Sequence, residues 1–207
     1  MDFLQKEYFL WFNLLAIGVF GFFISVDLFT MFMFYEVALI PMYLLIGVWG
    51  SGKKEYAAMK LTLMLMGGSA LLLVGILGIY FHSSTTGAFT MNLQEIAQAH
   101  AMPESLQRWF FPLVFTGFGV LGALFPFHTW SPDGHASAPT AVSMLHAGVL
   151  MKLGGYGCFR VAIHLMPEAA KELSWIFIIL TGISVVYGAY SAIVQTDLKY
   201  INAYSSV

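Results

Sequence analysis

Residues 143–157, SMLHAGVLMKLGGYG, place a single lysine, Lys152, in a stretch that carries no other formal charge. The stretch lies within a longer apolar run, residues 140–163, which is close to the roughly 20 residues that a helix needs to cross a bilayer core. Lys152 is twelve residues into this run, at a depth of about 18 Å for the helical rise of about 1.5 Å per residue. The sequence therefore predicts a membrane helix that holds a cation near its middle.

The composition of the whole chain is also that of a polytopic membrane protein. Of 207 residues, 59% are hydrophobic and 10% are charged, and the mean hydropathy is +0.78. Soluble globular domains carry about 25% charged residues, so that class is excluded. The net charge of −2, without a basic run, argues against a nucleic-acid partner. The single cysteine, Cys158, cannot form an internal disulfide, and we interpret it as a small buried hydrophobic residue.

Six apolar runs are each long enough to form a membrane-spanning helix. The predicted spans are residues 8–28, 29–49, 57–82, 109–130, 140–163 and 173–195, and a seventh begins within 197–207. The alternation of apolar and polar residues that is typical of β-barrel strands is absent from these runs. We therefore expect an all-α transmembrane helix bundle that forms one membrane domain over residues 1–207.

Three weaker signals complete the expected topology. The stretch 91–100 predicts a short amphipathic helix at the membrane interface. Glycines in the third and fourth spans favour close helix contact; they are Gly67, Gly68, Gly75, Gly78, Gly117, Gly119 and Gly122. A modest excess of lysine on one side places the loop at 50–56 in the cytoplasm; the lysines concerned are Lys6, Lys53, Lys54, Lys60 and Lys199.

Pro126, in LFPFHTW (124–130), predicts an interruption of the fourth span, because proline cannot donate a backbone hydrogen bond. Backbone groups freed inside a membrane must be satisfied by protein or by a water-filled cavity. His128 follows two residues later. With an ordinary pKa near 6.5, its imidazole is a candidate proton relay. The alternative is a structural histidine that steadies the break through a hydrogen bond.

Lys152 and Glu36 are the ionisable residues that lie deepest in the predicted spans. A charge at a helix centre costs about 2.5–3.5 kcal/mol on insertion scales. Lys152 is far from a helix end, which disfavours snorkelling, so we interpret it as a proton carrier. Glu36, in MFMFYEVALIPMYLL (31–45), is a second candidate, and a structural ion pair with a neighbouring lysine is its alternative. We expect both head groups to face one polar axis inside the bundle.

The other histidines carry weaker signals. His146 lies two turns before Lys152 and about 120° around the helix, so it is a neighbour of the lysine and not a stacked partner. His135, in SPDGHASAP (131–139), is expected at the surface. No role is assigned to His82, His100 or His164 at the segment edges. Because the sequence contains no nucleotide-binding loop, metal cluster or haem signature, we do not expect redox chemistry in this chain itself.

Several motifs together resemble one family, the antiporter-like subunits of respiratory complex I, of the subunit M or chain 4 type of NADH-quinone oxidoreductase. The longest is LFPFHTWSPDGHASAPTAVSMLHAGVLMKLGGYGCFR (124–160), with QTDLKYINAYSSV (195–207) downstream. MFMFYEVALIPMYLLIGVWG (31–50) is similar to the family's glutamate-bearing helix, and EYAAMKLTL (55–63) to the start of its next helix. The resemblance covers essentially all 207 residues. It implies a complete subunit of about fourteen helices with two inverted repeats, of which this chain is the first repeat, as a fragment or a truncated gene product.

The resemblance also implies which residues translocate protons. Glu36 matches the family's key glutamate and Lys152 its central lysine, while Lys60 and Lys199 match lysines near the cytoplasmic ends of their helices. The family's other central lysine would fall at Leu121, and the whole run 109–130 contains no lysine. We therefore expect Glu36 to pair with another cation, such as Lys60, or to be protonated. His128 and His146 complete the expected set.

As a function, the resemblance implies a proton-translocating membrane subunit of NADH-quinone oxidoreductase, a translocase that couples quinone reduction to proton transport. FMN, iron–sulfur clusters and quinone are expected in partner subunits and not in this chain. The implied partners are other membrane subunits of a hetero-oligomer and the lipid bilayer, with no nucleic acid. The expected location is the bacterial inner membrane, and the mitochondrial inner and thylakoid membranes are alternatives. Two other functions stay open: a subunit of a paralogous cation/proton antiporter or membrane-bound hydrogenase, and a non-pumping scaffold.

Overall fold

The computed structural model describes residues 4–83, 89–100 and 102–207, so residues 1–3, 84–88 and 101 of the expected domain lie outside it. Over the described residues the chain is an all-α bundle, as predicted. The first helices are α1 (Gln5–Ile24), α2 (Leu28–Trp49), α3 (Lys54–Phe81), α4 (Leu93–Ala99) and α5 (Glu104–Leu121). They are followed by α6 (Trp130–Ser137), α7 (Thr140–Leu145), α8 (Met151–Gly157), α9 (Pro167–Val194) and α10 (Leu198–Ser206).

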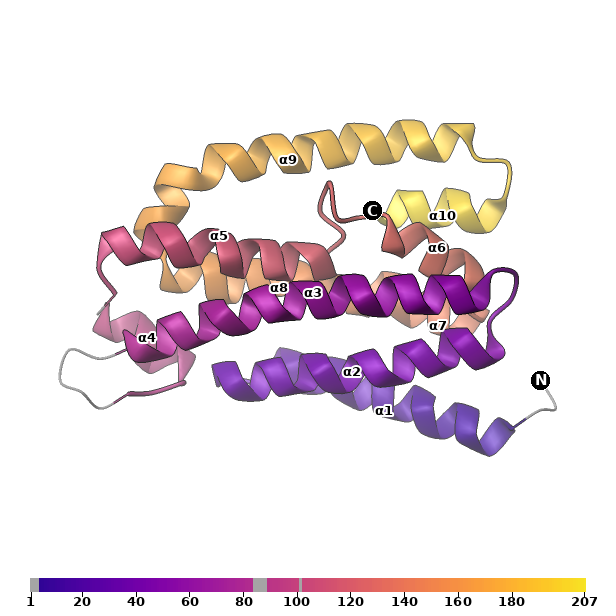
Figure 1. Cartoon of the computed structure of the whole chain (residues 1–207), viewed down its shortest axis with the longest axis horizontal. Coiled ribbons are helices and arrows are strands. Elements are labelled where there is room, and N and C mark those ends of the chain that lie inside the picture. The colour runs from indigo at the N-terminus through magenta and orange to yellow at the C-terminus, as the bar shows by residue number, and fades with distance from the viewer. Residues whose placement is uncertain (1–3, 84–88, 101) are drawn as a thin grey trace.

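The long helices lie along the long axis of the molecule, with α9 on one side and α1 and α2 on the other (Figure 1). The short helix α4 lies at one end, and α6 and α7 lie towards the opposite end, where α10 also begins. α2 packs between α1 and α3, and α3 packs on α5. The chain therefore has two distinct ends, and the broken segments α6 and α7 are together at one of them.

Glycines let α3 and α5 approach closely. An added Cβ on Gly117 would lie 2.9 Å from the backbone oxygen of Gly68, and a Cβ on Gly75 would overlap the side chain of Val114. This confirms that glycines of the third and fourth spans allow close helix contact, and it shows that the two helices contact each other. Gly67 differs, because an added Cβ there would meet nothing within 4 Å.

Four of the described helices, α1, α2, α3 and α9, are long and apolar enough to cross a membrane without interruption. The expected helix boundaries differ from the observed ones mainly where a helix begins with polar residues. Thus α3 starts at Lys54 and not at 57, and α9 starts at Pro167 and not at 173. Proline fits the first turn of a helix, since the backbone N–H it lacks would be unpaired there.

The fourth expected span, 109–130, is shorter than predicted at its end. α5 stops at Leu121, and α6 starts at Trp130 after eight non-helical residues, 122–129, that contain Pro126. Ser184 of α9 accepts a hydrogen bond from the Phe125 N–H at 2.7 Å, and the Trp130 indole donates to the Val120 carbonyl at 3.0 Å. The predicted interruption is therefore present, and it is held by side chains from two sides.

The fifth expected span, 140–163, is not a uniform α-helix. Two segments with wider, π-helical turns, His146–Leu150 and Cys158–Ile163, flank α8. Short π-helical segments are often found at functional sites. Because these turns hold more residues than an α-turn, the angle of about 120° predicted between His146 and Lys152 does not apply.

Candidate functional site

Lys152 lies on α8 at the wall of a groove of about 450 Å³. The groove is bordered by α5, α9 and the end of α10, through residues that include Phe118, Thr181 and Val207. Its lining is mostly apolar, and the Lys152 side chain is exposed in it. The lysine thus extends into a space between helices.

Glu36 lies elsewhere, on the outward face of α2. Residues 29, 33, 36, 40 and 43 recur at the spacing of one helix face, and four of them are exposed apolar side chains: Phe29, Met33, Ile40 and Tyr43. The Glu36 side chain is half-buried, and its Oε1 atom is buried without a hydrogen-bond partner. No residue of α2 lines the groove that contains Lys152. The structure therefore differs from our expectation that the two charges share one axis.

Lys60 is paired with a residue that the sequence did not single out. Its ammonium group is 2.7 Å from Oδ2 of Asp133, which joins α3 to α6. The hydroxyl of Tyr200 on α10 donates to the other oxygen of Asp133 at 3.5 Å. Both charged side chains are about a quarter exposed. The expectation that Lys60 pairs with Glu36 is therefore wrong, because Asp133 holds this lysine.

Lys199 binds backbone oxygens and not a carboxylate. Its ammonium group donates to the carbonyls of Ala136 and Ala138, at 3.3 and 3.4 Å. These carbonyls lie at the C-terminal end of α6, where the helix dipole favours a positive charge. The position of Lys199 is thus that of a cap which attaches the start of α10 to α6.

His135 is buried, although the sequence analysis expected it at the surface. It is 1% exposed, and its ring lies parallel to that of His146, with centroids 4.1 Å apart and an interplanar angle of 8°. The prediction failed because SPDGHASAP was taken as a surface loop, whereas residues 130–137 form a helix that packs on α3 and α10. The Nδ1 atom of His135 is hydrogen-bonded to the Ser143 hydroxyl, and the two atoms are 3.0 Å apart.

His146 is fully buried between two rings. It also stacks on Trp130, with centroids 5.3 Å apart and an interplanar angle of 16°. Neither ring nitrogen of His146 has a hydrogen-bond partner in the described part of the chain. The wide turn that begins at His146 therefore packs a titratable ring against α6.

His128 lies in the non-helical segment between α5 and α6. It is 4% exposed and packs between Phe125 and Tyr187, with ring centroids 5.6 and 4.8 Å away. Its Nδ1 atom is buried without a partner, and Lys60 is within electrostatic range. The buried Nδ1 atom suits a proton relay, and the aromatic packing suits a structural role, so both interpretations of His128 stay open.

Five titratable residues, which we call the interior polar file, comprise the Lys60–Asp133 pair, the stacked His135 and His146, and Lys152 in its groove. The groups come from α3, α6 and the segment 146–152. All of them can bind and release protons, and the described residues contain no group of three or more His, Cys, Asp or Glu side chains that could hold a metal ion. The chemistry that this arrangement supports is proton transfer.

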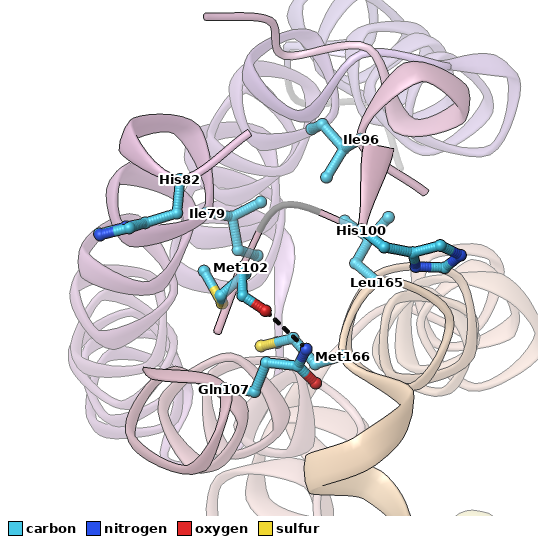
Figure 2. Close-up of a pocket in the computed structure, with 8 residues that line it drawn as sticks. All are labelled: Ile79, His82, Ile96, His100, Met102, Gln107, Leu165 and Met166. Atoms are coloured by element: carbon cyan, nitrogen blue, oxygen red, sulfur yellow. Dashed lines mark hydrogen bonds between the residues drawn. The ribbon is translucent and has the colours of Figure 1, made fainter. Parts of the chain in front are cut away.

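A small cavity near the other end of the molecule offers no comparable site. Its volume is about 10 Å³, which holds one water molecule at most. Figure 2 shows Gln107 donating from its amide to the Met102 carbonyl, at 3.0 Å, while the rings of His82 and His100 point away from the centre. The absence of an assigned role for these two histidines is consistent with this geometry.

Comparison with known proteins gives one family match. Residues 25–207 match the model of the family described as NADH:quinone oxidoreductase/Mrp antiporter, transmembrane. NADH-quinone oxidoreductase subunit M of Rickettsia bellii is 39% identical over 207 residues, which cover 98% of this chain and 40% of the relative. NAD(P)H-quinone oxidoreductase chain 4 3 of a Picosynechococcus strain is 42% identical over 187 residues, covering 90% of this chain and 34% of the relative.

Two solved structures share the fold. Respiratory complex I from Thermus thermophilus with bound NADH contains a chain that matches with a TM-score of 0.89 and 28% identity, over 98% of this chain and 42% of that one. The membrane-bound sulfane sulfur reductase, an archaeal respiratory membrane complex, matches with a TM-score of 0.88 and 28% identity, over 97% and 41%. The chain therefore spans about 40% of the length of the proteins that it matches.

Proposed function

Because the chain belongs to the NADH:quinone oxidoreductase/Mrp antiporter transmembrane family, we propose that it translocates protons as part of a membrane subunit of a complex I-like oxidoreductase. The observation that carries the proposal is the interior polar file. Titratable side chains in a membrane interior are costly, so they generally mark ion or proton pathways. Here Lys60 and Asp133 form an ion pair, His135 and His146 stack on each other, and Lys152 lies in its groove on α8.

Each part of the file has a distinct task. The Lys60–Asp133 pair lies towards the end of the bundle where the loop 50–53 joins α2 to α3, and it is the entry point. His128, in the non-helical segment before α6, extends the entry through its buried Nδ1 atom. Lys152 receives the proton at the far end, where its groove has room for water. Lys199 supports the entry by fixing α10 to α6.

Glu36 acts at a different surface. Its outward stripe is apolar apart from this one carboxyl group, and a charge facing hydrocarbon is unfavourable. We propose that another membrane subunit covers the stripe and contributes a partner for Glu36. This also explains why the glutamate lies away from the polar file of its own chain.

The electron-transfer steps belong to partner subunits. The relatives are subunits of an oxidoreductase complex, and we propose that FMN, iron–sulfur clusters and quinone bind there, so that this chain acts only as a translocase. The chain is an integral membrane protein. The two quinone oxidoreductase relatives are bacterial, and we assign the chain to a bacterial inner membrane.

A second candidate follows from the other structural match. The archaeal sulfane sulfur reductase matches almost as well as complex I, so the chain would also suit a respiratory complex with a different electron acceptor. Co-purification distinguishes these two candidates, because NADH-binding and quinone-binding subunits would accompany the chain only in a complex I-like oxidoreductase. The task of the polar file is the same in both.

Replacing Lys152 in the full-length subunit tests the proposal. In vesicles that contain the assembled complex, we expect Lys152→Ala to remove this subunit's contribution to the proton-to-electron ratio. Lys152→Arg should do the same, since arginine keeps its proton at all accessible pH values. A normal ratio in Lys152→Ala, with assembly intact, would favour a scaffold and exclude the lysine as a carrier.

A further inference from the structure

The non-helical segment 122–129 and Lys152 border the same groove. The residues that line it include Gly122, Ala123 and Leu124 of this segment, Lys152 and Gly154 of α8, and Ser184 of α9. Gly154, two residues after the lysine, packs so closely on the segment that an added Cβ would overlap the backbone of Gly122. The helix that carries Lys152 therefore contacts the backbone directly at the point where α5 ends.

Segment 122–129 contains a residue in a backbone conformation that its side chain disfavours. Ala123 has a φ of 56°, in the left-handed region, and it is 1% exposed. Residues other than glycine persist in this region only where the surrounding structure imposes it. On the α5 side, the Ala123 N–H donates to the Val120 carbonyl at 3.1 Å and the Leu124 N–H to the Gly119 carbonyl at 2.8 Å. These bonds fix the start of the segment.

Beyond Leu124 the segment depends on α9, towards which the connection between α5 and α6 extends in Figure 1. Ser184 accepts the hydrogen bond of the Phe125 N–H at 2.7 Å, and the next residue, Pro126, has no N–H to offer. Ser184 is 6% exposed, and α9, which the structure describes over its whole length, buries no other polar side chain. Because backbone groups in a membrane interior require a partner within the protein or water, this bond determines where the segment lies.

We propose that Ser184 is a positioning residue for Lys152. Its hydroxyl holds the backbone at Phe125, the strained backbone at Ala123 is thereby fixed, and the contact of Gly122 with Gly154 sets the position of α8 beside the lysine. Ser184 takes up no proton in this role, since it acts only through the backbone. The inference rests on the proposed proton translocation and adds the residue that holds its lysine in place.

Hydrogen exchange of the assembled complex, resolved to single amides by mass spectrometry, tests the first contact. In Ser184→Ala we expect the Phe125 amide to exchange about fivefold faster, the factor that corresponds to about 1 kcal/mol for one hydrogen bond. Ser184→Thr keeps the hydroxyl and should exchange as the wild type does. Ser174→Ala is the matched control on the same helix, because the Ser174 hydroxyl donates to the Lys171 carbonyl of α9 itself. Equal exchange at Phe125 in Ser184→Ala and wild type would overturn the proposal.

Cryo-electron microscopy of the assembled Ser184→Ala complex tests the second contact. We expect Gly122 and Gly154 to lie farther apart than in the wild type, and the Lys152 side chain to be displaced within its groove. An unchanged contact between the two glycines would overturn the positioning role. This comparison does not depend on any measurement of proton transport.

The proton-to-electron ratio in vesicles tests the consequence for function. We expect Ser184→Ala to lower the ratio towards that of Lys152→Ala, whereas Ser184→Thr and Ser174→Ala keep the wild-type ratio. A threonine variant that behaves like alanine would overturn the role of the hydroxyl. If Lys152→Ala lowers the ratio and Ser184→Ala does not, the positioning role is overturned and the proposed function stands. If Lys152→Ala leaves the ratio unchanged, the proposed function is overturned, and the positioning role with it.

Discussion

At the scale of single residues, the Lys60–Asp133 pair joins two helices through positions 73 residues apart. Removing one member of an exposed pair costs about 0–1 kcal/mol, whereas breaking a buried pair costs about 3–5 kcal/mol because the remaining charge is unpaired. Each side chain here is about a quarter exposed, so the cost lies between these limits. The pair should therefore contribute measurably to stability as well as to proton entry.

A double-mutant cycle measures this contribution. We expect Lys60→Met and Asp133→Leu each to lower the thermal unfolding midpoint of the full-length subunit, and the double variant to lower it less than the two single effects added together. Lys171→Met, which breaks the exposed pair with Glu168, is the control and should have little effect. Additive losses in the cycle would show that the two side chains do not interact.

Sequence reasoning found the charged residues of the site more readily than their partners. Lys152 and Glu36 are conspicuous because each carries a charge within an apolar run, whereas Lys60 was found through the family resemblance. Asp133 and His135 were missed because SPDGHASAP resembles a surface loop in composition, and only the packing of α6 buries it. The stacking of His135 on His146 joins two helices, and no local pattern of residues reports such a contact.

At the scale of helices, the contact between α3 and α5 depends on glycine at specific positions. We expect Gly75→Ala to destabilise the full-length subunit by about 1–3 kcal/mol, the range found when atoms are inserted into a well-packed core. The added methyl group would overlap Val114. Gly67→Ala, on the same helix but facing open space, should cause no loss. Equal unfolding midpoints for the two variants, measured in detergent, would contradict this packing.

The type of each long helix could be predicted from apolar periodicity and length, but its interruptions could be predicted only in part. Pro126 marked the break after α5. The two π-helical segments around α8 carry no comparable signal, since their residues, HAGVL and CFRVAI, resemble those of an ordinary membrane helix. The first segment begins at His146, whose ring stacks on Trp130, and this tertiary contact has no signal in the local sequence.

At the scale of the whole molecule, much of the apolar surface has no cover within the described chain. Along α9, large side chains such as Ile178, Val185 and Ile193 are exposed. Exposed apolar surface of this extent is typical of contact with lipid or with other subunits. The chain spans about 40% of its relatives, and the relatives with solved structures work in multi-subunit membrane complexes. Under the proposed function, the polar file is one part of a larger proton pathway.

The most direct test of the proposed function replaces the charged residues at both ends of the polar file and measures proton transport. The measurement is the proton-to-electron ratio of the assembled complex in vesicles, with Lys60→Met, Asp133→Leu and Lys152→Met combined in the full-length subunit. These changes replace the charged groups by apolar ones of similar size, so the bundle should still assemble. We predict a ratio lowered by the whole contribution of this subunit. An unchanged ratio, with normal assembly, would contradict the claim that protons pass through these residues.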